Sequence, residues 1–138
     1  MRYALIGLVI VTHGKLAQEL RNATEHVVGP QDFMETVCIG PDDDMERRRD
    51  DIRAAIKRVS GDHGAILLTD MFGGTPSNLA ISMLNRDKVE VVAGVNLPML
   101  IKLSEARQTA DLVEAAKTAK EAGQRYIAIA SEILAGEI

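Results

Sequence analysis

Apolar residues in this chain fall into short unbroken runs, and these runs alternate with segments in which apolar residues recur at helical spacing. Unbroken runs are typical of strands covered on both faces, and the recurring spacing is typical of helices with one buried face. The sequence therefore predicts an α/β fold with an open, mainly parallel sheet and helices on both faces. The expected strands are Ala4–Val11, Glu35–Ile39, Ala65–Thr69 and Val89–Ala93, with Tyr126–Ala130 as a candidate last strand.

The segments between the strands carry helix-end signals as well as apolar faces. Gly29-Pro30 ends the first helix, and the carboxylates of Asp42–Asp44 suit the start of the second. Thr75, which proline follows, and Thr109 are expected to cap the helices after them, and Asn96–Met99 forms a turn into a further short helix. The predicted buried positions are Leu16, Leu20, Ala23 and Val27 in the first helix, Met45, Ile52, Ile56 and Val59 in the second, Leu79, Ala80 and Met83 in the third, and Leu112, Ala115, Ala116 and Ala119 in the last.

Composition narrows the class of protein. The 138 residues suit a single domain, 1–138, with an aliphatic core, because aromatic residues make up only 3% of the chain. A net charge of -4, without aromatic residues among the Lys and Arg, argues against a nucleic-acid partner. The single cysteine, Cys38, excludes a disulfide within one chain. No stretch approaches the roughly 20 apolar residues that span a bilayer, and no signal-peptide cleavage site follows the first run, so we expect a cytoplasmic protein without membrane insertion.

Polar clusters follow two of the predicted strands, and each contains a residue that can do chemistry. His13 ends the first apolar run, and Asp70 follows the strand Ala65–Thr69. Because the carboxyl ends of parallel strands share one edge of a sheet, we expect His13 and Asp70 at the same edge. If Asp70 accepts a hydrogen bond from one ring nitrogen, it fixes the tautomer and leaves the other nitrogen with a free lone pair. His13 is then a candidate nucleophile, and Asp70 the residue that orients it.

The surroundings of this pair suit a phosphoryl group or another anion. Two predicted helix starts direct unpaired backbone N–H groups and positive dipole ends toward this edge. Glycines let the backbone approach a ligand closely, and hydroxyls can donate to its oxygens. Phosphoryl transfer requires mainly alignment and charge stabilisation, so we expect neither a metal nor a cofactor. The candidate phosphoryl-binding residues are Thr12, Gly14, Gly73, Gly74, Thr75 and Ser77.

A purely structural interpretation of these residues stays open. His13 can be a polar surface residue, Asp70 a turn residue, and Gly73–Pro76 a tight strand-to-helix connection. His26 and His63 lack the ligand spacing of a zinc site, and the acids of Asp42–Asp44 and the arginines of Arg47–Arg49 suit a helix start and a solvated face.

Familiar phosphate and nucleotide motifs are missing. The Gly73-Gly74 turn lacks the lysine of a P-loop, and no G-x-G-x-x-G follows a strand, so neither ATP nor NAD is supported. Histidine phosphatases carry an arginine before the histidine, where this chain has Thr12. A hydrolase acting on phosphate esters is a weak third hypothesis, because no second acid-base group or arginine clamp is evident.

Three motifs resemble the EIIA component of the mannose-type sugar phosphotransferase system (PTS). They are Val11–Gly14, Thr69–Asn78 and Ala93–Leu100, each at the end of a predicted strand. The resemblance implies that the phosphocarrier protein HPr phosphorylates His13, that the group passes to an EIIB partner, and that Asp70 lies beside His13. It also implies a sheet order of 2-1-3-4 and a homodimer in which a C-terminal antiparallel strand is exchanged between subunits.

The resemblance thus predicts a phosphotransferase component, a phosphohistidine carrier in sugar uptake or a regulatory phosphorelay. EIIB is expected either on a separate chain or not at all, and an EIIC/EIID membrane permease would be an indirect partner of a transporter. The alternative is a regulatory phosphoprotein that binds target proteins according to the phosphorylation state of His13, without sugar transport. The related phosphotransfer subunit of dihydroxyacetone kinase lacks the Gly-Gly-Thr-Pro pattern found at Gly73–Pro76. The sequence does not identify the sugar.

Overall fold

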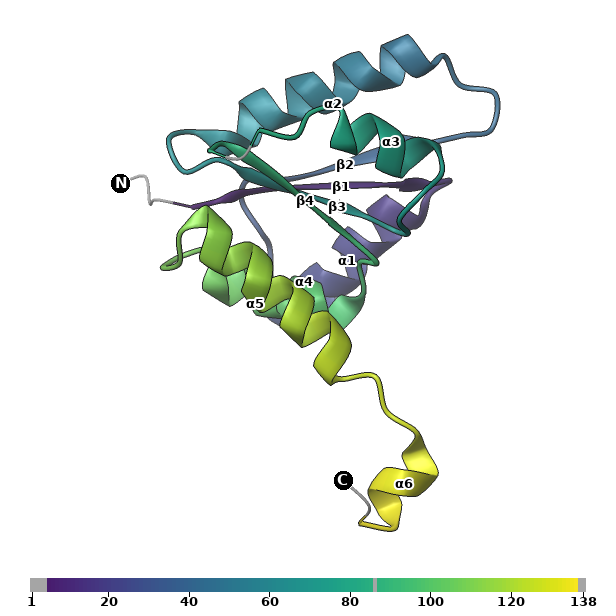
Figure 1. Cartoon of the computed structure of the whole chain (residues 1–138), viewed down its shortest axis with the longest axis vertical. Coiled ribbons are helices and arrows are strands. Elements are labelled where there is room, and N and C mark those ends of the chain that lie inside the picture. Colours follow the sequence, from purple (N-terminus) through teal and green to yellow (C-terminus); the bar gives the residue numbers. More distant parts are fainter. Residues whose placement is uncertain (1–4, 86, 137–138) are drawn as a thin grey trace.

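A sheet of parallel strands forms the centre of the molecule (Figure 1). The structure is a computed structural model that describes residues 5–85 and 87–136. The strand order β2-β1-β3-β4 places β1 inside the sheet and β4 at one edge, which confirms the predicted fold class and the order implied by the resemblance. The strands are β1 Gly7–His13, β2 Met34–Ile39, β3 Ala65–Thr69 and β4 Val89–Ala93.

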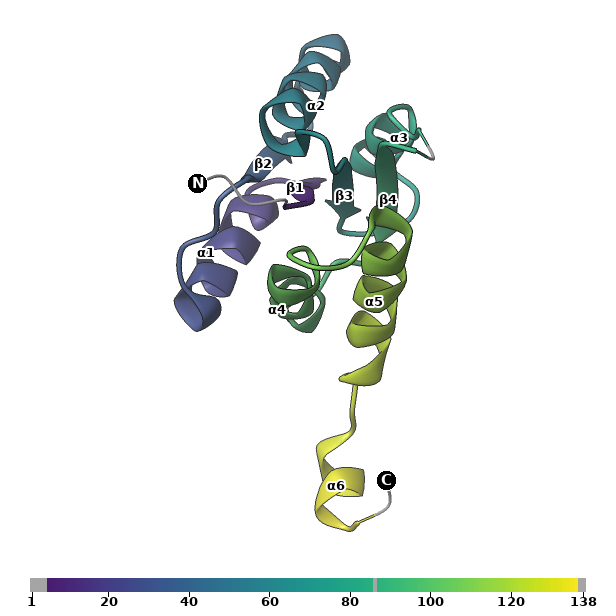
Figure 2. The same cartoon turned by 90° about the vertical axis from the view of Figure 1, so that its left-hand side faces the viewer.

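Helices cover both faces of this sheet (Figure 2). Helices α1, α4 and α5 pack on one face, and α2 and α3 pack on the other. Because a crossover connects each strand to the next, all four strands are parallel. Their carboxyl ends therefore lie together at one end of the sheet, called the carboxyl edge below. The helices are α1 Leu16–Val28, α2 Met45–Ser60, α3 Thr75–Ile81, α4 Leu97–Ala106, α5 Leu112–Arg125 and α6 Ala130–Leu134.

The side chains of β1 alternate between two cores, which explains its unbroken apolar run. Leu8 and Ile10 belong to the core under α1, α4 and α5, and Val9 and Val11 belong to the core under α2 and α3. All four have 0% of their surface exposed. Alternation along a strand places every second side chain on the same face. His13 is therefore on the α2–α3 side of the sheet.

At the amino-terminal end of the strands, opposite the carboxyl edge, a buried arginine is hydrogen-bonded to the segments before β1 and β2. Arg107, at the end of α4, is only 2% exposed. Its guanidinium donates to the carbonyl of Ile6 at 2.9 Å, to the carbonyl of Phe33 at 2.8 Å and to the side-chain oxygen of Gln31 at 3.3 Å. Burial lowers the pKa of Arg107 to about 10, so the group still carries its charge at neutral pH.

The predicted buried face of α1 is partly wrong. Leu16 is 45% exposed and Val27 is 55% exposed, whereas Ala17 and Thr24 are buried against the sheet. The Thr24 hydroxyl donates to the carbonyl of Leu20 at 2.8 Å. Because this bond satisfies the hydroxyl within the helix, a threonine can take a core-facing position that the apolar pattern assigned to its neighbours.

Two predicted helix caps are also wrong. Helix α5 is capped by Asp111, whose carboxylate accepts from the N–H of Glu114 at 2.9 Å, and not by Thr109. The cap position of α3 is Gly74, so Thr75 is already the first helical residue. The acidic start of α2 is confirmed, since Asp44 accepts from the first backbone N–H groups of that helix.

The candidate last strand does not form in the single chain. Residues 127–129 have no strand structure, and α6 begins at Ala130. This C-terminal segment extends away from the body of the molecule (Figures 1 and 2). Its side chains are exposed, with Ile127 at 76% and Ile129 at 60%. A strand needs a neighbouring strand to bond with, and in the described part of the chain this segment is not hydrogen-bonded to any strand of the sheet.

Candidate functional site

His13 and Asp70 meet at the carboxyl edge of the sheet, as the sequence predicts. His13 is the last residue of β1, and Asp70 follows the last residue of the neighbouring strand β3. His13 Nδ1 lies 2.8 Å from Asp70 Oδ2, and the backbone N–H of His13 donates to the same oxygen at 3.0 Å. A carboxylate only accepts, so Nδ1 carries the proton and Nε2 has the free lone pair.

The Asp70 carboxylate is held on its other side as well. Its Oδ1 accepts from the N–H of Met71 at 3.1 Å, and its side chain is only 14% exposed. Partial burial raises the pKa of Asp70, but the hydrogen bonds from the backbone and ring of His13 together lower it more, so the net pKa lies below the ordinary value. Asp70 is therefore ionised at neutral pH and can stabilise positive charge on the His13 ring.

The free nitrogen of His13 faces a gap that a glycine leaves open. A Cβ built on Gly74 would lie 3.4 Å from both Cε1 and Nε2 of the imidazole. Gly74 also has a φ of 88° and a ψ of 172°, a conformation in which side chains are strongly disfavoured. At Gly73, φ is 95°, but an added Cβ would meet nothing within 4 Å. Of these two glycines, Gly74 is therefore the one at which a side chain would contact the His13 ring at Cε1 and Nε2.

Two of the predicted phosphoryl-binding groups are already used in hydrogen bonds within the protein. Thr12 is 0% exposed, and its hydroxyl oxygen accepts from the N–H of Ala17 at 2.7 Å. The backbone N–H of Gly14 donates to the carbonyl of Ile39 at 2.8 Å. Thr12 therefore fixes the start of α1 under the site, and Gly14 ties the His13 turn to the end of β2.

The other predicted residues lie at the start of α3, on the His13 side of the sheet. Thr75 is exposed, and its side chain makes no capping bond. Ser77 is 0% exposed, and its hydroxyl oxygen has no hydrogen-bond partner within the described residues. Buried hydroxyls are normally paired, so Ser77 has unused hydrogen-bonding capacity next to the site.

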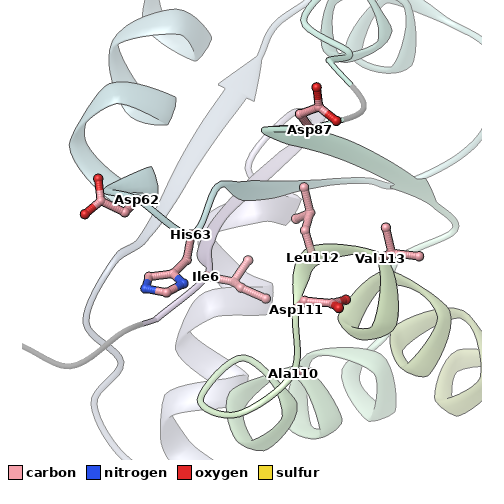
Figure 3. A pocket seen from close by; sticks show the side chains of 8 residues that line it. All are labelled: Ile6, Asp62, His63, Asp87, Ala110, Asp111, Leu112 and Val113. Carbon is pink, nitrogen blue, oxygen red and sulfur yellow. The ribbon is translucent and has the colours of Figure 1, made fainter.

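The histidine and aspartate side chains at the other end of the sheet do not point toward a common centre. His63, Asp62, Asp87 and Asp111 line a cavity of about 330 Å³ at the opposite edge of the sheet, but their side chains point in different directions (Figure 3). The described residues contain no group of three or more His, Cys, Asp or Glu side chains placed to hold a metal ion. Within the same residues, no helix is long and apolar enough to cross a membrane.

Comparison with known proteins connects this geometry to a family. The family model described as "PTS system fructose IIA component" (EIIA-man) matches residues 7–120. The chain belongs to this EIIA family. It is 27% identical over 131 residues to the "PTS system fructose-specific EIIA component" of Bacillus subtilis (strain 168). This alignment covers 94% of the chain and 90% of the relative.

Two further relatives agree with this assignment. The chain is 32% identical over 103 residues to the "PTS system mannose-specific EIIAB component" of Escherichia coli (strain K12), covering 74% of this chain and 32% of that longer protein. The PTS IIA protein associated with the fucose utilization operon from Streptococcus pneumoniae has a similar structure, with a TM-score of 0.84 and 25% identity. That comparison covers 97% of this chain and 99% of the other.

The sequence predicted the His13–Asp70 pair but missed part of what holds it. The backbone N–H of His13 and the N–H of Met71 both donate to the Asp70 carboxylate. No residue type signals such bonds, because every non-proline residue carries the same N–H group. The proximity of Gly74 to the ring likewise depends on the path of the loop and not on any local pattern.

Proposed function

We propose that this EIIA-family chain is a phosphoryl carrier that accepts a phosphoryl group from phosphorylated HPr on His13 and passes it to an EIIB partner. Membership of a family of PTS components supports the phosphotransferase role. The observation that carries the proposal is the 2.8 Å contact between His13 Nδ1 and Asp70 Oδ2, which leaves Nε2 as the nucleophile. Asp70 acts on the ring and not on the phosphoryl group.

The proposed transfer exchanges one P–N bond for another. The lone pair on His13 Nε2 attacks phosphorus, and the bond to the donor's histidine nitrogen breaks and returns its electron pair to that nitrogen. A donor ring that is protonated on its other nitrogen leaves as neutral imidazole. The His13 ring keeps its Nδ1 proton and becomes positively charged, and the adjacent Asp70 carboxylate stabilises that charge. Transfer to EIIB reverses these steps.

Residues around Nε2 would hold the phosphoryl oxygens. The Gly73–Gly74 loop provides room, and the first turn of α3 presents N–H groups that have no partner within the helix. The exposed hydroxyl of Thr75 and the unpaired hydroxyl of Ser77 are further donors in our proposal. Thr12 and Gly14 would contribute indirectly, because they position the turn that carries His13.

The exposure of His13 favours a protein as phosphoryl donor. The His13 side chain is 52% exposed, whereas small-molecule sites usually enclose most of their ligand. A protein donor brings its own surface and its own orienting contacts. Such a carrier would work in the cytoplasm, and any membrane permease would be reached through EIIB.

We also propose that the chain forms a homodimer through its C-terminal segment. Strand β4 has a free edge, and a groove of about 710 Å³ runs between it and α5. Ile127 and Ile129 alternate with alanines, so their side chains fall on one face of an extended segment. If this segment pairs with β4 of a second copy, both the free edge and the exposed isoleucines become buried.

Intact-mass analysis tests the carrier chemistry. The purified chain is incubated with phosphoenolpyruvate, EI and HPr, and its mass is measured at alkaline pH because phosphohistidine is acid-labile. We expect one added phosphate on the wild type and none on His13→Ala. Asp70→Asn should still be phosphorylated, but about 100-fold more slowly, which is the low end for the loss of one group that stabilises charge in the transition state. A phosphate on His13→Ala would refute the assignment of the nucleophile.

Transfer beyond this chain separates the two possible roles. The phosphorylated chain is mixed with EIIB proteins from the same cell, and loss of its phosphate is followed by mass. Transfer supports the carrier role. If the phosphate stays in place, and target proteins bind the phosphorylated and unphosphorylated forms differently, the chain is a regulatory phosphoprotein instead.

A further inference from the structure

Three large apolar side chains are exposed beside the His13–Asp70 pair. Leu16 is 45% exposed, Met71 is 54% exposed and Phe72 is 78% exposed. Leu16 begins α1 just after the His13 turn, and Met71 and Phe72 follow Asp70 directly. Figure 1 shows the ends of β1 and β3 and the starts of α1 and α3 together on one side of the molecule. The apolar side chains therefore come from both strand ends that build the site.

The loop that carries two of these residues is fixed to the site. The N–H of Met71 donates to Asp70 Oδ1, while Asp70 Oδ2 accepts both hydrogen bonds from His13. Met71 and Phe72 therefore lie in the loop that follows the residue bonded to His13, close to where a donor would approach the ring. Met and aromatic residues are enriched at the centres of protein interfaces, where they gain affinity by leaving water.

We propose that Leu16, Met71 and Phe72 form an apolar docking rim for the phosphohistidine-bearing protein that donates to His13. This inference rests on the proposed carrier function. The rim supplies the contact area that the exposed imidazole lacks, and it excludes water from the two histidines during transfer. The donor that fits carries an apolar surface around its own phosphohistidine.

The position of the rim favours this donor over a second copy of the chain. The groove along β4 is lined by Phe72 and Ile127 but not by Leu16 or Met71. Strands β3 and β4 both lie between β1 and a segment seated on the free edge of β4, so such a segment would not reach the end of β1. Leu16 and Phe72 come from the connections that follow β1 and β3, the two strands whose ends carry His13 and Asp70, and a donor to His13 must bind there.

Steady-state transfer from phosphorylated HPr tests the rim. Leu16→Ala and Phe72→Ala are compared with the wild type, and Val113→Ala serves as control because Val113 is 59% exposed on α5 at the opposite edge of the sheet. We expect each rim variant to raise KM about 10-fold while kcat stays within about two-fold, which corresponds to the loss of one interface contact. Phe72→Leu should restore most of the affinity, and Val113→Ala should behave as wild type.

Two companion measurements separate docking from other effects. The hydrolysis rate of the isolated phosphorylated chain should be unchanged in the rim variants, and so should the oligomeric mass in sedimentation. An unchanged KM, or an equal rise in Val113→Ala, would overturn the rim. A change of oligomeric mass in Phe72→Ala would assign Phe72 to a second copy instead. If the wild type takes no phosphate, the proposed function itself fails, whereas a phosphorylated wild type with unaffected variants overturns the rim alone.

Discussion

His13 differs from an ordinary surface histidine because both its ring and its backbone bond the same carboxylate oxygen. Asp70 Oδ2 accepts from Nδ1 at 2.8 Å and from the backbone N–H at 3.0 Å. These two bonds fix the position of the ring relative to the strand end as well as its tautomer. At the scale of single residues, we therefore predict that the reactivity of Nε2 depends on Asp70 and on the small size of Gly74.

Gly74→Ala should block the site more than its neighbour Gly73→Ala does. Both glycines have positive φ, so alanine should cost stability at either position, about 1–2 kcal/mol. Only at Gly74 would the new Cβ lie 3.4 Å from Cε1 and Nε2 of His13. We expect the initial rate of phosphorylation by HPr to fall at least about 10-fold in Gly74→Ala relative to Gly73→Ala. Equal rates in the two variants would show that the space at Gly74 does not matter.

The contribution of Asp70 to stability should depend on pH with a definite sign. Its folded-state pKa is below the ordinary value of 3.8, so the folded state holds fewer protons than the unfolded state in that range. The stabilisation is present above pH 3.8 and is lost as the pH falls through the folded pKa. Urea unfolding of the wild type and Asp70→Asn should show a difference that shrinks as the pH falls below 3.8. A difference that grows in acid would contradict this sign.

At the scale of elements, the helices that follow β1, β2 and β4 each begin with a side-chain hydrogen bond. Thr12 holds the start of α1 through Ala17, and Asp44 caps α2. Asn96 accepts from the N–H of Met99 and donates to the carbonyl of Gly123, which joins the start of α4 to the end of α5. These bonds fix the starts of three helices at the end of the sheet where His13 and Asp70 lie.

Arg107 performs the corresponding role at the amino-terminal edge. Its three hydrogen bonds join α4 to the segments before β1 and β2. Arg107→Ala leaves the carbonyls of Ile6 and Phe33 without their side-chain donor, and we expect a loss of about 3 kcal/mol in the free energy of unfolding. Urea denaturation measures this loss, and the His13 site, at the opposite edge, should keep its phosphorylation rate in the folded variant. A loss below about 1 kcal/mol would show that water replaces these bonds.

The sequence predicted elements better than it predicted their faces and ends. The bounds of Ala65–Thr69 and Val89–Ala93 agree with β3 and β4, because short apolar runs between glycines or turns have few alternatives. The stripe of α1 was misassigned because Thr24 is satisfied inside the helix and takes a buried place. His13 and Asp70 were predictable because strand order brings the ends of β1 and β3 together, whereas the positions of single N–H groups depend on loop paths.

At the scale of the whole molecule, the C-terminal segment extends away from the body of the protein and exposes apolar side chains (Figure 1). Tyr126, Ile127 and Ile129 are each at least 60% exposed, and the groove beside β4 is open. A homodimer that exchanges this segment would bury these side chains and the free edge of the sheet at once. The candidate strand Tyr126–Ala130 would then form only in the assembled protein.

Replacing Ile127 and Ile129 together by Asp should disrupt this dimer. Two carboxylates on the buried face of the exchanged segment would be desolvated, and we expect the dimer dissociation constant to rise at least about 100-fold. Sedimentation velocity over a range of protein concentrations measures the change. Ile133→Asp, in α6, is the control, because Ile133 is 49% exposed but lies beyond the segment expected to pair. A wild type that is monomeric at every concentration would rule out the proposed dimer.

The proposed mechanism depends on which nitrogen of His13 accepts the phosphoryl group. Asp70 occupies Nδ1, and the gap at Gly74 opens toward Nε2. The most direct test is to phosphorylate the ¹⁵N-labelled chain through HPr and record long-range ¹H–¹⁵N spectra of the imidazole with ³¹P coupling at alkaline pH. We predict that phosphorus is coupled to Nε2 and that Nδ1 keeps its proton. Phosphorus on Nδ1 would contradict the account, because the Asp70 contact would have to break before each transfer.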